Sequence, residues 1–128
     1  MRLLIDSHAL IWFCEGNPAL SPVARGVMED GANERFISHA TPWEMAIKLT
    51  LGKLQLQSDF AVIFPGVLNA NGFAMLTPNL EHYRALIHLP RHHGDPFDRL
   101  IIAQAKVDGM AVVTCDPNFP QYGVTIVW

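Results

Sequence analysis

Four acidic residues that lie far apart in this sequence stand in similar places. Each comes just after a predicted strand or in the first turns of a predicted helix; they are Asp6, Glu44, Asp98 and Asp116. Carboxylates held within a few ångströms of one another repel, which raises their pKa values unless a cation neutralises them. Hard divalent cations that prefer oxygen ligands, Mg²⁺ or Mn²⁺, suit such a group. A water molecule acidified by such an ion can attack a phosphodiester.

The helix predicted over residues 95–108 shows this placement most clearly. Asp95 is suited to cap the helix, Pro96 suits a first turn where its missing N–H has no partner, and Gly109 is suited to end it. Asp95 and Asp98 are three residues apart, so they point to the same side of the helix. The helix dipole also favours acids here. This segment alone therefore leaves both a capping role and a ligand role open.

The other three acids also have ordinary structural explanations. Asp6 can cap a helix or belong to a turn, the segment 116–118 can form a turn, and Glu44 can pair with Lys48 one helical turn later. Acids after three strands and at the start of the intervening helix are nevertheless hard to explain as coincidence. In α/β sheets, the binding site lies at the carboxyl ends of the strands, where these segments would meet.

Strand and helix signals alternate along the chain. Apolar runs predict strands over 2–5, 35–38, 73–76, 110–114 and 123–127. Caps, prolines and glycines predict helices that begin at Ser7, after Ser21, at Thr41, near Ser58, after Asn79 and at Asp95. The strands are too apolar for a solvated face, which indicates a parallel sheet covered on both sides. We therefore predict a single α/β domain, residues 1–128, with three α/β/α layers and a mostly parallel sheet of about five strands.

Two of these helices carry more detailed predictions. Val23, Val27 and Met28 form the expected inner face of the second helix. Pro65 predicts a kink or break within the helix expected over 58–69, because proline lacks the N–H that an internal position would use.

Composition limits the classes of protein to which the chain can belong. Half of the residues are hydrophobic and 16% are charged, which excludes a disordered chain and a nucleic-acid-coating protein. The net charge of −3 makes long-range attraction to RNA or DNA weak, so nucleic acid must be bound at a local site. Cys14 and Cys115 have no metal-binding spacing, and no apolar run is long enough to span a membrane. We expect a cytoplasmic protein with reduced thiols and no membrane association.

Several other polar residues near the acids have alternative roles. His92 and His93 project in different directions and lack a zinc-site pattern; His93 can instead contact a phosphate or cap its loop. Basic residues near the acids either hold RNA phosphates, remain solvated surface charges, or form internal pairs, such as Arg99 with an acid; they are Lys48, Lys53, Arg91 and Arg99. Hydroxyls beside strand ends either position a water or phosphate oxygen or act as caps; they are Ser7, Ser38 and Thr114.

Three aromatic residues also lie near the acids, and we expect them in the core; they are Trp12, Phe13 and Trp43. If Trp12 or Phe13 were exposed instead, it would suit a partner helix in a groove.

Four motifs occur in order along the chain: Leu3–Trp12, Thr41–Lys48 with Leu51–Leu54, His93–Ala105, and Val113–Asp116. Together they resemble the PIN domain, and most of all the VapC-like toxins of bacterial type II toxin–antitoxin systems. The resemblance extends from Leu3 to Val127.

This resemblance implies a metal-binding group formed by Asp6, Glu44, Asp98 and Asp116, with Asp95 lying behind the ligands. It further implies an Mg²⁺- or Mn²⁺-dependent endoribonuclease that hydrolyses RNA with a metal-activated water. The implied partners are an RNA substrate, a cognate antitoxin that blocks the site, and a second copy of the chain in a homodimer.

Two other classes of protein share features with this sequence. One has the same fold without the activity, and the other also gathers acids at strand ends. A PIN-like module could bind an antitoxin or RNA without cutting it. An aspartyl-phosphate protein is disfavoured, because the haloacid-type phosphatases need a second aspartate where this chain has His8. Receiver domains need paired acids near the N-terminus and a lysine after a late strand, whereas Lys106 falls inside a predicted helix.

Overall fold

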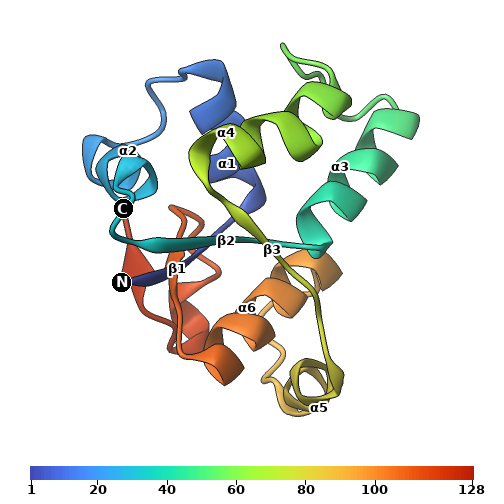
Figure 1. The fold of residues 1–128 in the computed structure, drawn as a ribbon. Helices are drawn as coiled ribbons and strands as arrows, with labels where there is room; N and C mark the ends of the chain where they lie inside the picture. Colours follow the sequence, from blue (N-terminus) through green and yellow to red (C-terminus); the bar gives the residue numbers. More distant parts are fainter.

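A five-stranded sheet forms the centre of the structure, a computed structural model that describes residues 1–128 (Figure 1). The strands are β1 (Arg2–Ile5), β2 (Glu34–Ser38), β3 (Ala74–Leu76), β4 (Ala111–Val113) and β5 (Ile126–Val127). Their order across the sheet is β3-β2-β1-β4-β5, and every neighbouring pair is parallel. Ile5 at the end of β1 is in register with Ile37 of β2 and Val113 of β4. The carboxyl ends of these three strands therefore lie at one edge of the sheet.

Helices cover both faces of the sheet. They are α1 (Ser7–Glu15), α2 (Pro22–Glu29), α3 (Ala40–Thr50), the π-helical turn η1 (Val62–Val67), α4 (Leu68–Asn71), α5 (Leu80–His88), α6 (Pro96–Asp108) and the 3₁₀ turn η2 (Pro120–Tyr122). Figure 1 shows α1, α2 and α4 on one side of the sheet and α5 and α6 on the other. The prediction of three layers around a parallel sheet is confirmed. No helix combines the length and apolar character that crossing a membrane requires.

The alternating side chains of the strands divide the core into two clusters. On β1, Leu3 and Ile5 pack among residues of α1 and α2, whereas Leu4 packs against residues of α6. All three are fully buried. Because β1 is the central strand and is covered on both faces, every one of its inner positions is apolar. The sheet therefore gives the residues at its carboxyl edge a rigid base.

The structure corrects several local predictions. Asp6, not Ser7, caps α1, because its carboxylate reaches the backbone N–H of Ala9. In α2, Val23 is 57% exposed, and Ala24 takes the inner position expected for it. The last strand is limited to β5, two residues long.

The predicted helix over 58–69 is broken, as its internal proline indicated. Phe64 has non-helical angles (φ −115°, ψ 105°) directly before Pro65, and the peptide bond between them is cis. A proline cannot donate the hydrogen bond that a helix interior uses, so a regular helix does not pass through this position.

Candidate active site

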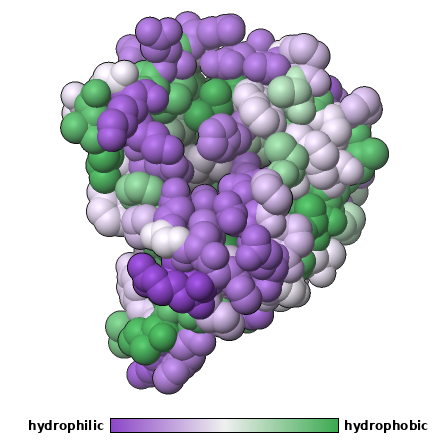
Figure 2. Space-filling view, turned by 180° about the vertical axis from the view of Figure 1, so that it is seen from behind, coloured by the Kyte–Doolittle hydropathy of each residue, from purple (hydrophilic) through white to green (hydrophobic).

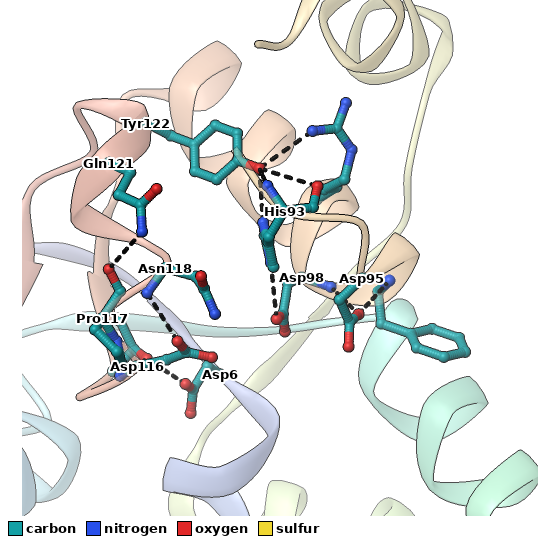
Figure 3. A network of polar contacts seen from close by, with 12 residues as sticks. Asp6, His93, Asp95, Asp98, Asp116, Pro117, Asn118, Gln121 and Tyr122 are labelled. Atoms are coloured by element: carbon teal, nitrogen blue, oxygen red, sulfur yellow. Dashed lines mark hydrogen bonds and ion pairs between the residues drawn. The ribbon is translucent and has the colours of Figure 1, made fainter. Parts of the chain in front are cut away.

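The four predicted acids gather at the carboxyl edge of the sheet, although they come from separate elements. Asp6 directly follows β1, Asp116 follows β4, Asp98 lies in the first turn of α6, and Glu44 lies in α3. In Figure 3, Asp6 and Asp116 lie beside each other, and Asp98 and Asp95 form a second pair that faces them across a gap. The charges of Asp116 and Glu44 both contribute to raising the pKa of Asp98, so both of these carboxylates lie within range of its charge.

Asp6 is held from two sides. One oxygen, Oδ1, accepts a hydrogen bond from the N–H of Ala9 at 2.7 Å, and Oδ2 accepts one from the Thr114 hydroxyl. The same hydroxyl accepts a hydrogen bond from the N–H of Asp116 at 3.1 Å. Burial raises the pKa of Asp6, and its hydrogen bonds to Thr114 and Ala9 oppose that rise. Thr114 thus couples the acids that follow β1 and β4.

Glu44 is buried, and both of its oxygens are occupied. Ser7 donates to Oε1 at 2.9 Å, and Lys48 donates to Oε2 at 2.6 Å. The expected pairing of Glu44 with Lys48 is therefore present. The hydrogen bond to Glu44 chiefly raises the pKa of Lys48, and the charges of Asp95 and Asp98 raise it further. The Lys48 ammonium accordingly lies among the acids and neutralises part of their charge.

Asp98 is held in position by the first turn of α6. Asp95 caps this helix, because its Oδ1 accepts hydrogen bonds from the N–H groups of Phe97 and Asp98 at 2.9 and 3.0 Å. The pKa of Asp98 is raised to about 6, first by burial and then by the charge of Asp95. A hydrogen bond between Oδ2 of Asp98 and Nε2 of His93, at 3.2 Å, opposes this rise in pKa.

Asp116 forms the turn that its sequence allows, since its Oδ1 accepts the N–H of Asn118 at 2.9 Å. Beside it lies a pocket of about 240 Å³, lined by Asp6, His8, Trp12, Cys115, Asp116 and Pro117. Asp116 is only half-buried, so its second oxygen is open to a ligand in this pocket.

The chemistry of this group suits a hard divalent cation. All of its acids offer oxygen ligands, and one oxygen each of Asp95, Asp98 and Asp116 has no hydrogen-bond partner within the chain. Burial raises the pKa of Asp98 most, and repulsion from neighbouring acids, which a cation would relieve, raises it further. As the side chains stand, however, no three His, Cys, Asp or Glu groups are close enough together to hold one ion. The oxygen donors of these acids suit a metal ion, whereas the distances between the acids are too long for one ion to contact three of them.

Some residues have other roles than the sequence indicated. Arg99 is buried and donates to the carbonyls of Pro90 and Leu89, so its predicted roles as an RNA contact or an acid's partner are wrong. Ser38 donates to Gln104 at 2.6 Å inside the core, while its oxygen accepts the N–H of Ala40, the ordinary capping role.

The aromatic residues near the acids differ in burial. Trp12 and Phe13 are half-buried against the core, but Trp43 is 59% exposed, against expectation. Trp43 contacts Phe97 edge to face, with ring centroids 5.1 Å apart. It therefore extends the surface of α3 rather than filling the interior.

Tyr122 is the participant that the sequence did not reveal. Its hydroxyl contacts Nδ1 of His93 at 2.6 Å and accepts a hydrogen bond from Arg99 at 3.2 Å. It lies in η2, within a proline-rich stretch that has neither helical nor strand periodicity, so no sequence pattern pointed to it.

Comparison with known proteins identifies the family to which the chain belongs. The family model of the PIN domain matches residues 3–124. The chain belongs to the PIN-domain family. No curated protein matches it.

Solved structures show the same fold at low identity. VapBC2 from Rickettsia felis, bound to a DNA fragment from its promoter, includes a chain that is 11% identical with a TM-score of 0.72; the match covers 98% of this chain and 97% of that one. FitAB bound to the IR36 DNA fragment includes a chain that is 17% identical, with a TM-score of 0.63; the match covers 97% of this chain and 92% of that one. FitAcB from Neisseria gonorrhoeae includes a chain that is 15% identical, with a TM-score of 0.59; the match covers 97% of this chain and 95% of that one. The family match confirms the resemblance to a PIN domain, and these neighbours share its fold.

Proposed function

We propose that this PIN domain is an Mg²⁺- or Mn²⁺-dependent endoribonuclease, the cytoplasmic toxin of a type II toxin–antitoxin system. One observation carries the proposal: acids from four separate segments gather at the carboxyl edge of a parallel sheet, where α/β folds bind ligands. Burial, and then the charges of neighbouring carboxylates, raise the pKa of Asp98 to about 6, and a carboxylate perturbed in this way is typical of functional sites.

The residues have distinct roles in this proposal. Asp6, Glu44, Asp98 and Asp116 would hold the cation, and Asp95 would support Asp98 from its capping position. A bound divalent cation would neutralise the acids and acidify a water molecule for attack on a phosphodiester. Ser7 and Thr114 orient Glu44 and Asp6 through their hydroxyls. The Lys48 ammonium, placed beside the acids, is available for a phosphate of the RNA.

We also propose a protein partner, a cognate antitoxin. The solved neighbours that share this fold include VapBC2 and FitAB, each in complex with DNA. In this chain, the pocket beside Asp6 and Asp116 is walled by the half-buried Trp12. A segment of an antitoxin that packs on Trp12 would cover the acids and block them.

A second copy of this chain is the other proposed partner. Apolar side chains lie exposed on α3 and α5, namely Trp43, Leu80, Tyr83 and Ile87. Two of them, Trp43 and Tyr83, line a groove of about 470 Å³ between α3, α5 and α6. In Figure 2, the projection at the lower left, which corresponds to α5 at the lower right of Figure 1, carries apolar surface. A homodimer that packs these helices together would bury this surface.

The deciding experiment is cleavage of RNA by the purified protein with Mn²⁺. Asn caps helices as well as Asp does, so Asp6→Asn keeps the start of α1 and removes one charge from the site. We expect this variant to lose activity by about 100-fold or more. Glu29→Gln, an exposed acid on α2, serves as the control and should retain wild-type activity. Equal cleavage by Asp6→Asn and the wild type would contradict the proposal.

A non-catalytic module is the second candidate, and the spacing of the acids favours it. No three of them are close enough to hold an ion in this structure. That function predicts RNA or antitoxin binding without cleavage at any Mn²⁺ concentration, and no effect of Asp6→Asn on binding. End-mapping of RNA after expression of the wild type and Asp6→Asn distinguishes the two functions.

A further inference from the structure

His93 lies between Tyr122 and Asp98 and contacts both through its ring nitrogens. Nδ1 is 2.6 Å from the Tyr122 hydroxyl, and Nε2 is 3.2 Å from Oδ2 of Asp98 (Figure 3). The His93 side chain is 13% exposed and that of Asp98 is 20% exposed. Because both ring nitrogens are occupied within the protein, His93 has none left for an RNA phosphate, one of the two roles considered from the sequence.

The partners of the Tyr122 hydroxyl determine where the imidazole carries its proton. A tyrosine oxygen can accept two hydrogen bonds and donate one. It already accepts from the backbone N–H of His93 at 3.1 Å and from the Arg99 guanidinium at 3.2 Å, and neither of these donors can reverse its role. The hydroxyl hydrogen is therefore left for Nδ1 of His93, at 2.6 Å. Its only alternative acceptor is the His93 carbonyl, at 3.4 Å.

A neutral imidazole that accepts at Nδ1 must carry its hydrogen on Nε2. In this tautomer, Nε2–H donates to Oδ2 of Asp98. The opposite tautomer would place two hydrogens between Nδ1 and the tyrosine oxygen and would leave Nε2 and the carboxylate facing each other as two acceptors. The hydrogen-bond pattern thus allows one neutral form of His93.

The tyrosine itself is firmly anchored. Tyr122 is 4% exposed, and Arg99, which donates to its hydroxyl, also donates to the carbonyl of Pro90 at 2.9 Å. Lys106, two turns further along α6, donates to the carbonyl of Tyr122 at 2.7 Å. The hydroxyl that selects the tautomer is therefore fixed relative to the first turn of α6, where Asp98 lies.

We propose that His93 is a positioning residue that holds one oxygen of Asp98 through its Nε2–H, and that Tyr122 fixes the tautomer this requires. The other oxygen of Asp98 has no partner within the chain and remains available to a cation. Hydrogen-bonded partners of this kind orient carboxylate ligands and strengthen metal binding. This inference rests on the proposed function only in its final step, the binding of the cation.

The tautomer is tested in the metal-free protein, independently of activity. Long-range proton–nitrogen NMR correlations of His93 at about pH 8, where an ordinary histidine is neutral, should show a protonated Nε2 and an unprotonated Nδ1. Tyr122→Phe removes the donor to Nδ1 and should yield a mixture of tautomers. A protonated Nδ1 in the wild type, or an unchanged spectrum in Tyr122→Phe, would overturn the proposal.

The consequence for the cation is tested by calorimetric titration with Mn²⁺ alone. We expect His93→Ala to weaken Mn²⁺ binding by about tenfold, and His93→Gln, whose amide can still donate to Asp98, to recover part of the loss. His92→Ala is the matched control, because the exposed His92 packs on the Tyr122 ring with centroids 4.8 Å apart and makes no hydrogen bond to Asp98. Equal affinities of His93→Ala and His92→Ala would overturn the positioning role. A wild-type protein that binds no Mn²⁺ would instead contradict the proposed function. The NMR measurement of the tautomer would still test the hydrogen bonds of His93.

Discussion

Asp98 shows how a single ionised residue of the acidic site lowers the free energy of unfolding. Burial and neighbouring acids raise its pKa from 3.8 to about 6. Between these two values, the folded protein binds more protons at this position than the unfolded chain does, so stability falls as pH rises. Above about pH 6, the full cost of the ionised carboxylate is present in the metal-free protein.

Asp98→Asn should therefore stabilise the metal-free protein at pH 8, by about 1 kcal/mol once solvent screening of this partly exposed group is allowed for. The Asn carbonyl can still accept from His93, so the local packing is retained. The gain should be mostly lost by pH 4 and absent below about pH 3, where Asp98 is protonated in both states. Urea denaturation of both proteins from pH 4 to pH 8 measures the difference. A gain of the same size at both ends of this range would contradict the assignment.

Lys48 offers a second test at the scale of a single residue, because it neutralises the buried Glu44. Lys48→Met keeps the aliphatic length and removes the charge, which leaves one carboxylate oxygen without its donor. We expect a loss of about 1–3 kcal/mol in the free energy of unfolding. In the double variant with Glu44→Gln, the charge to be neutralised is gone, so the loss should be smaller than the sum of the single effects. Additive losses would show that the pair does not interact.

At the scale of the element, α6 depends on its cap. Asp95 accepts hydrogen bonds from two backbone N–H groups of the first turn, one of which belongs to Asp98. Asp95→Ala should destabilise the protein by about 1 kcal/mol, whereas Asp95→Asn should preserve stability, because Asn is an equally good cap. Thermal melting of the two variants provides the measurement. A loss in Asp95→Asn as large as that in Asp95→Ala would show that the charge of Asp95, rather than its capping bonds, stabilises α6.

The ends of the elements were predictable where a residue type enforces them. Pro96 and Gly109 bound α6 as expected, because proline suits a first turn and Gly109 adopts a positive φ of 63°. Prediction failed where two neighbouring residues could do the same task. Asp6 and Ser7 are both good caps, and only the tertiary contact with Thr114 shows how Asp6 is oriented.

At the scale of the whole molecule, the order of the acids along strands predicted their convergence, since parallel strands place their carboxyl ends at one edge. The surrounding hydrogen bonds were not predictable in the same way. Arg99 and Tyr122 meet because η2 folds against α6, a contact between segments 23 residues apart in sequence that no periodic pattern announces. The burial of Arg99 follows from carbonyl partners that exist only in the folded loop before α6.

Assembly into a dimer gives a prediction at this same scale. Leu80, Tyr83 and Ile87 share one side of α5 and are exposed by 70%, 44% and 76%. A charge in the centre of a buried apolar interface is strongly unfavourable, so Ile87→Asp should shift the protein from dimer to monomer. Analytical ultracentrifugation measures the change, with Val23→Asp on the exposed face of α2 as the control. A wild-type protein that is monomeric at high concentration would contradict the proposed homodimer.

Cation binding also acts on the whole molecule, because the proposed ligands come from segments that only folding brings together. An ion that binds the folded chain alone stabilises it by about 2.7 kcal/mol at 100 times its dissociation constant. For a domain of this size, Mn²⁺ should then raise the melting temperature by about 10 °C. The double variant Asp98→Asn with Asp116→Asn removes two acids that have a free oxygen and should lose most of this rise. An equal rise in this variant would place the ion elsewhere on the protein, since only binding among these acids depends on their charge.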